Sequence, residues 1–162
     1  MPQPAAKQSE RKSTAKPANG NCEKYNSYRE AFARIKQAQA EGWYFEAVTL
    51  QESILCDRLQ SHLIAIGIPK ISSDRSTVGN LIRKIEQAKV STLPADLFAA
   101  ISTWWQDRNI VVHAFAKSHP GEPTRSVDAA LMHAKKAAKD GDRLIRNVLK
   151  WFRAQKKLHS ES

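Results

Sequence analysis

The sequence predicts an all-α protein, a bundle of about five helices. Apolar residues recur every three or four positions through five segments of the chain, which is the spacing of an amphipathic helix. No segment alternates apolar and polar residues with the period of two that a half-buried strand requires. Short stretches containing glycine or proline separate the five segments, as the loops of helical bundles do.

The N-terminal segment differs in composition from the rest of the chain. Residues 1–21 are rich in Pro, Ala, Lys, Ser and Gln and contain almost no large apolar side chains. Such a segment cannot bury enough apolar surface to offset the entropy lost on ordering it. We therefore predict a disordered basic tail over residues 1–21 and one helical domain over residues 22–162.

The first two helices are predicted over 23–41 and over 43–66, with Gly42 between them. Their apolar faces are formed by Tyr25, Tyr28, Phe32 and Ile35 in the first helix and by Phe45, Val48, Leu55, Leu59, Leu63 and Ile66 in the second. Glu52 falls near the middle of the second apolar face, whereas Asp57 falls well off it, where a charge costs little.

Three more helices follow. Ser76 or Thr77 is predicted to cap a helix that runs to about residue 89, and residues 91–94 open a fourth helix that runs to about residue 116. The fifth helix is predicted from about residue 124 or 126 to about residue 158. Gly141 predicts a bend or a break within it, because glycine weakens a helix interior.

The C-terminal half of the fourth helix carries a charge in an unusual place. On a helical wheel Trp104, Trp105, Val111 and Val112 share one apolar arc, and Arg108 falls near its middle. Desolvating a guanidinium costs several kcal/mol unless it has a partner. Because Glu52 holds the corresponding position in the second helix, we predict that Glu52 and Arg108 pair inside the bundle. The pair can serve chemistry, or it can be a buried ion pair without a chemical role.

Composition limits the other function classes. The only two cysteines, Cys22 and Cys56, form no disulfide framework and have no metal-finger spacing with histidine. No carboxylate cluster, secretory segment or membrane-spanning run appears, so we predict a cytoplasmic protein with no metal and no cofactor. The net charge of +10 favours a nucleic-acid partner only weakly, because four basic residues face one acidic residue in each of the segments 1–21 and 150–162.

The segment Arg108-Asn109-Ile110-Val111-Val112-His113-Ala114-Phe115 resembles the signature of HEPN-domain proteins. That signature is Arg, four to six residues and then His, often with Asn directly after the Arg and an aromatic residue two places after the His. In the nucleotidyltransferase-linked HEPN toxins the aromatic residue is typically Tyr, whereas here it is Phe115. The resemblance covers residues 23–158 through the helix order and is sharp only over 108–115.

The resemblance implies a metal-independent endoribonuclease of toxin or antiviral-defence type, which cleaves RNA by attack of the 2′-OH on the adjacent phosphate. His113 would then transfer protons, because an imidazole titrates near neutral pH. Arg108 would stabilise the charge that grows on the phosphorane, and Asn109 would hold His113 or the phosphate. Glu52 would orient Arg108, and Phe115 would support the motif.

The resemblance also implies partners. Arg108 and His113 are five residues apart, about 140° around a helix, so one motif does not aim both side chains at one phosphate. In the family, two motifs face each other across a homodimer and together form the cleft. The resemblance also implies a possible second protein as partner, an antitoxin or a nucleotidyltransferase. Two other readings stay open: a non-catalytic HEPN module that binds RNA or a protein partner, and a plain helical scaffold.

Overall fold

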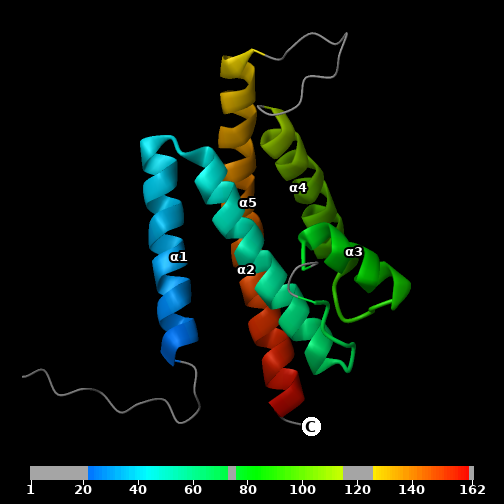
Figure 1. The fold of residues 1–162 in the computed structure, drawn as a ribbon. Helices are drawn as coiled ribbons and strands as arrows, with labels where there is room; N and C mark the ends of the chain where they lie inside the picture. Colours follow the sequence, from blue (N-terminus) through cyan, green and yellow to red (C-terminus); the bar gives the residue numbers. More distant parts are fainter. Residues whose placement is uncertain (1–21, 73–75, 115–125, 161–162) are drawn as a thin grey trace, which may run out of the picture.

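The computed structural model describes residues 22–72, 76–114 and 126–160, and these residues form five α-helices and no strand. The helices are α1 (Cys22–Glu41), α2 (Tyr44–Ala65), α3 (Val78–Gln87), α4 (Ala95–Ala114) and α5 (Val127–Ser160). The predicted all-α bundle of about five helices is therefore confirmed (Figure 1). The predicted tail over 1–21, the loop over 117–124 and Phe115 lie outside the described residues.

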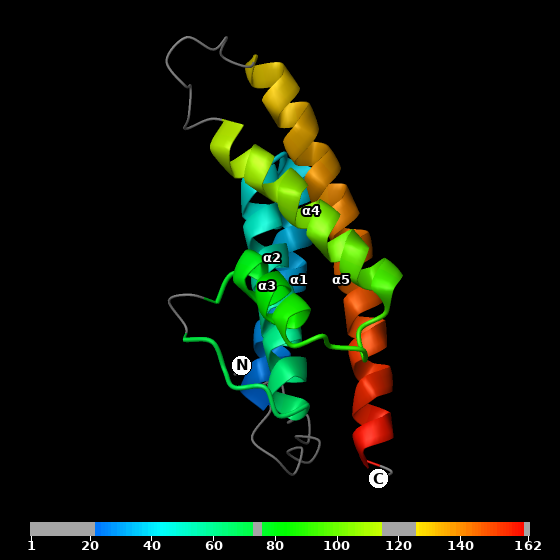
Figure 2. The same ribbon diagram turned by 90° about the vertical axis from the view of Figure 1, so that its right-hand side faces the viewer.

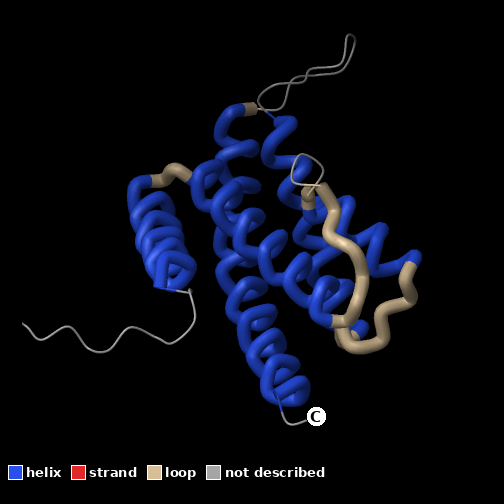
Figure 3. Tube along the Cα trace, turned by 60° about the horizontal axis from the view of Figure 1, so that its bottom comes forward, coloured by secondary structure: helices blue, strands red, loops and turns tan. Residues whose placement is uncertain are grey.

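Two long helices organise the bundle. α2 contacts α1, α3 and α5, and α5 runs the length of the molecule and also contacts α4 (Figures 1 and 2). α4 and α5 are antiparallel, because Thr92, just before α4, accepts a hydrogen bond from Trp151, whereas Trp104 donates to Ala137. Short connections join α1 to α2 and α3 to α4 (Figure 3). None of the described helices is both long and apolar enough to cross a membrane.

The helix ends follow the sequence signals. Gly42 and Gly67 follow α1 and α2 with positive φ angles of 79° and 83°, the left-handed conformation that glycine adopts without strain. Thr77 caps α3, its Oγ1 accepting from the backbone N–H of Asn80 at 3.2 Å, as the sequence predicted. Ser126 caps α5 in the same way, accepting from the backbone N–H of Ala129 at 3.2 Å.

The core lies between α2, α4 and α5, with α1 and α3 closing its sides. Its largest fully buried side chains are Ile35, Leu55, Leu59, Leu63, Leu81, Ile101, Ile145, Gln51, Val48, Val78, Val111 and Val148. Trp104 is a core residue, only 3 % exposed, as predicted. The prediction that Tyr25 belongs to the buried face of the first helix is wrong. It has the right helical spacing, but it lies in the first turn of α1 and is 65 % exposed.

A bend or a break was predicted at Gly141, and the break is wrong, because α5 continues through this residue. The glycine instead allows three helices to approach closely. A Cβ atom at position 141 would lie 2.6 Å from Cδ of Gln51 in α2 and 2.9 Å from Nε1 of Trp104 in α4. Gln51 is fully buried and donates to the carbonyl of Ala138 at 2.7 Å and to Asp142 at 3.0 Å. This contact fixes the positions of α2 and α4 against α5.

Candidate functional site

The guanidinium of Arg108 in α4 forms an ion pair with Glu52 in α2. Nη2 of Arg108 lies 2.5 Å from Oε2 of Glu52, and the side chains are 19 % and 12 % exposed. The pairing predicted from the sequence is therefore confirmed. Each helix places one charge in its apolar stripe, and packing α4 near α2 brings the two charges together. The attraction between them then offsets much of the free energy that desolvating each charge costs.

Two neighbours on α4 hold the rest of the Arg108 side chain. Its Cζ lies 4.9 Å from the ring centroid of Trp105, a cation–π contact. Nη1 donates to Oδ1 of Asn109 at 3.1 Å, so that this amide oxygen is engaged with the guanidinium. Nε is buried and has no hydrogen-bond partner among the described residues. The guanidinium is thus fixed in place and keeps unused donor capacity.

His113 lies on the other side of α4. It is exposed, in the last turn, about 140° around the helix from Arg108. Asn109 is half-buried between the two, one turn before His113. Within the described part of one molecule, the structure therefore gathers Arg108, Asn109 and Glu52 and leaves His113 apart.

A second polar contact joins α4 to α5 beside this pair, and the sequence analysis missed it. Oδ1 of Asp107 lies 3.8 Å from Nε2 of His133, and Oδ2 lies 3.7 Å from Nζ of Lys136. Lys136 also pairs with Asp140 at 2.7 Å, and this hydrogen bond raises the pKa of Lys136. These residues set the register of α4 on α5. The contact depends on how the two helices pack, so the spacing of residues within either helix does not predict it.

No group of three or more histidine, cysteine, aspartate or glutamate side chains capable of holding a metal occurs within residues 22–72, 76–114 and 126–160. The polar groups that lie closest to Arg108 are the carboxylate of Glu52 and the amide of Asn109, and both contact the guanidinium.

The thiol of Cys56 lies one turn beyond Glu52, and its pKa is affected by the charges of Glu52 and Arg108. Burial and then the negative charge of Glu52 raise its pKa from 9.0 to about 12, although the charge of Arg108 opposes the shift. The unfolded thiol ionises from about pH 9 and the folded one only near pH 12. Its contribution to stability is therefore complete below pH 9 and is lost as the pH rises between these values.

We expect Ellman's reagent at pH 8 to modify the exposed Cys22 rapidly and Cys56 about a thousandfold more slowly, because Cys56 forms so little thiolate. The rates are measured on single-cysteine variants, Cys22→Ser and Cys56→Ser. In denaturant both thiols should react alike. Equal rates in the folded protein would contradict the half-buried position of Cys56 and the raised pKa of its thiol.

Comparison of the chain with protein-family models, curated protein sequences and solved structures finds no match. The resemblance to HEPN proteins rests on Arg108-Asn109 and His113 and on the order of the helices, and it stays a prediction.

Proposed function

We propose that the chain is a metal-independent endoribonuclease whose cleavage site contains Arg108, Asn109 and His113. One observation carries the proposal: a guanidinium fixed by a buried carboxylate and an exposed imidazole belong to the same short stretch of α4. A fixed cation stabilises the charge that develops on a phosphorane, and an exposed imidazole can exchange protons with RNA. The resemblance of residues 108–115 to the HEPN signature points to the same chemistry.

In the proposed reaction the RNA 2′-OH gives its proton to a base as its oxygen attacks the adjacent phosphorus. The bond from phosphorus to the 5′-oxygen breaks, and that oxygen takes a proton from an acid, leaving a 2′,3′-cyclic phosphate and a 5′-OH. His113 serves as base or acid, and Arg108 stabilises the phosphorane oxygens. Glu52 is a positioning residue, because it holds the guanidinium and does not face the solvent.

We propose that the complete site forms between two copies of the chain. The angle between Arg108 and His113 prevents one α4 from directing both at one phosphate, whereas a twofold contact brings the partner's His113 within reach. Ile110 lies on the same outer face as His113 and is 37 % exposed, which leaves an apolar side chain for such a contact. The toxin or antiviral-defence role and an antitoxin or nucleotidyltransferase partner belong to this proposal.

We expect the purified protein, freed of any co-purifying partner, to cleave single-stranded RNA in the presence of EDTA. His113→Ala should lower the rate by about 10²- to 10⁴-fold, the usual contribution of a general acid or base, without loss of helix content. Gln106→Ala removes an exposed side chain from the same face of α4 and should leave the rate unchanged. Loss of cleavage in EDTA, or equal rates for wild type and His113→Ala, would refute the proposal.

A second candidate is a non-catalytic module that binds RNA or a protein partner. One observation favours it: within one molecule His113 lies apart from the Arg108–Glu52 pair, so a single copy does not bring the proposed catalytic groups together. RNA binding without turnover, with affinity that falls steeply as salt rises, would establish this candidate over the enzyme.

A further inference from the structure

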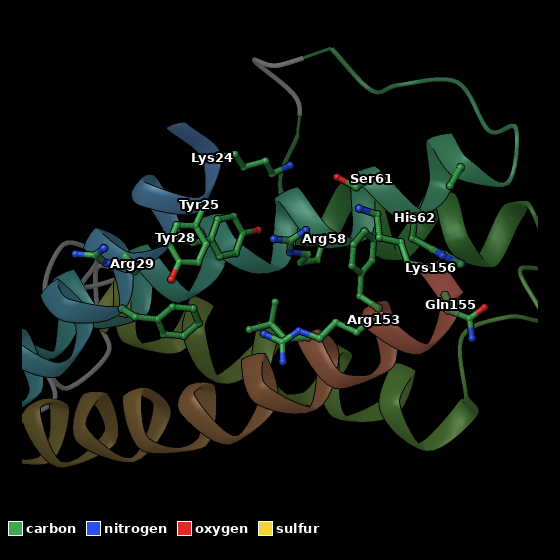
Figure 4. Close-up of a pocket in the computed structure, with 14 residues that line it drawn as sticks. Lys24, Tyr25, Tyr28, Arg29, Arg58, Ser61, His62, Arg153, Gln155 and Lys156 are labelled. Carbon is green, nitrogen blue, oxygen red and sulfur yellow. The ribbon is translucent and has the colours of Figure 1, made fainter. Parts of the chain in front are cut away.

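A cavity of about 810 Å³ lies between the N-terminal half of α1, the C-terminal half of α2 and the C-terminal half of α5 (Figure 4). Its lining combines cations with aromatic rings and contains neither aspartate nor glutamate. The cations are Lys24, Arg29, Arg58, Arg153 and Lys156, and the rings are Tyr25, Tyr28, Phe32 and Phe152. This volume falls within the range typical of sites for small ligands.

Arg58 lies at the centre of the lining (Figure 4). Its Cζ is 4.2 Å from the ring centroid of Tyr28 in α1 and 4.8 Å from that of Phe152 in α5, so its guanidinium contacts a ring from each helix. Its Nε is buried without a hydrogen-bond partner among the described residues. The same atom forms a long ion pair with Asp57, whose Oδ2 is 3.9 Å away. The edge of the guanidinium therefore retains capacity for an anionic ligand.

Asp57 compensates only part of the positive charge. It accepts hydrogen bonds from Lys24 at 2.9 Å and from the hydroxyl of Tyr28 at 2.5 Å. Burial and then this hydrogen bond raise the pKa of Tyr28 above its usual range, so its hydroxyl keeps its proton and continues to donate. Arg29, Arg153 and Lys156 form no ion pair with any residue in the described ranges, and all three are exposed. The rim of the cavity thus carries three uncompensated cations.

The rim also offers an aromatic surface. Tyr25 lines the cavity and is 65 % exposed, although a ring as large as that of tyrosine normally packs against other side chains. A positively charged groove that contains accessible rings is the common way in which proteins bind unpaired nucleotides, since every base has a flat face to stack.

We propose that this cavity binds a nucleotide of an unpaired RNA strand, with its base against Tyr25 and its phosphate at Arg58 and the rim cations. The strong positive charge of the chain disfavours two other occupants, a second copy and the basic segment 1–21. An unpaired strand fits better than a duplex, because paired bases are stacked on each other and cannot enter. Arg58 is the anchor of the phosphate and Tyr25 the platform of the base.

The cavity is separate from the proposed cleavage site. Asp107 in α4 meets Lys136 in α5, and from there Arg153 and His113 lie in opposite directions along the antiparallel pair. At the rise of an α-helix they are roughly 35 Å apart along the helix axes. The choice of RNA as the strand rests on the proposed function, but binding in the cavity does not depend on cleavage by His113, and the two can fail separately.

The test measures the affinity of the full chain for a short, fluorescein-labelled single-stranded RNA by fluorescence polarisation. The RNA is 2′-O-methylated, so it lacks the 2′-OH nucleophile and cannot be cut. We expect the triple variant Arg29→Gln/Arg153→Gln/Lys156→Gln to bind at least about tenfold more weakly and to lose part of the salt dependence. The control Lys135→Gln/Lys139→Gln/Arg146→Gln removes the same charge from exposed positions of α5 outside the cavity. Equal affinities for the two variants would overturn the proposal.

The aromatic part is tested with Tyr25→Ala, which we expect to weaken binding about tenfold, the usual scale for one stacked base. Trp43→Ala removes another exposed ring, 54 % accessible and outside the cavity lining, and should have no effect. Displacement of the RNA by 5′-AMP but not by pyrophosphate would support a nucleotide site that free nucleotides also enter. RNA binding that 5′-AMP does not displace would assign the site to the strand. Equal displacement by pyrophosphate, or equal affinity for duplex RNA, would overturn the proposal.

Discussion

We expect Arg108→Ala to lower the free energy of unfolding by about 3 kcal/mol, because it leaves Glu52 buried without its partner. The value lies at the lower end of the range for broken buried pairs, since one-fifth of the Arg108 side chain remains in contact with solvent. Glu52→Ala should cost a similar amount. Urea denaturation monitored by circular dichroism measures both. Arg34→Ala breaks the exposed pair with Glu30 in α1 and should cost less than about 0.5 kcal/mol.

The double variant Glu52→Leu/Arg108→Met removes both charges and keeps the apolar volume. It should recover most of the stability lost by either single change, because neither charge is left unpaired. If the variant folds normally but no longer cleaves RNA, the guanidinium acts in catalysis as well as in packing. A double variant as unstable as the sum of the single ones would show that the two side chains do not interact.

The position of this pair could be predicted from the sequence, because each helix carries a single charge inside a regular apolar stripe. An unpaired charge in that position is destabilising, and pairing Glu52 with Arg108 is the arrangement that leaves neither charge unpaired. The same spacing argument identified the five helices and the buried Trp104, and residue type gave Ser76 or Thr77 as the cap of α3, of which Thr77 is the one observed. These features depend on periodicity and on local hydrogen bonds, which a single sequence contains.

The features that were missed depend on how distant helices pack. Asp57 was predicted to lie off the apolar face, where a charge costs little, but its partners in α1 were not foreseen. Burial acts to raise its pKa, and the hydrogen bonds from Tyr28 and Lys24 outweigh burial, so that the pKa is lowered. Arg58 gains its two aromatic neighbours from α1 and α5, which are far away in the sequence. No pattern within α2 reports what neighbouring helices bring to it. The cavity and its cations therefore became visible only in the structure.

A glycine within a helical segment can mark a weak point of the helix or a place where another helix approaches closely, and the sequence alone does not say which. Substitutions at Gly141 can distinguish these two roles. If this glycine were only a weak point of α5, Gly141→Ala would stabilise the protein by about 1 kcal/mol through helix propensity. We expect the opposite, a loss of about 1–3 kcal/mol, because the new methyl group overlaps the amide of Gln51 and the indole of Trp104. Gly141→Leu should cost more. Asn147→Ala, at an exposed position of the same helix, gains the propensity without the overlap and should not destabilise. Thermal and urea unfolding compare the variants, and a stabilised Gly141→Ala would show that α2 and α4 do not approach α5 as closely as their contact with Gly141 requires.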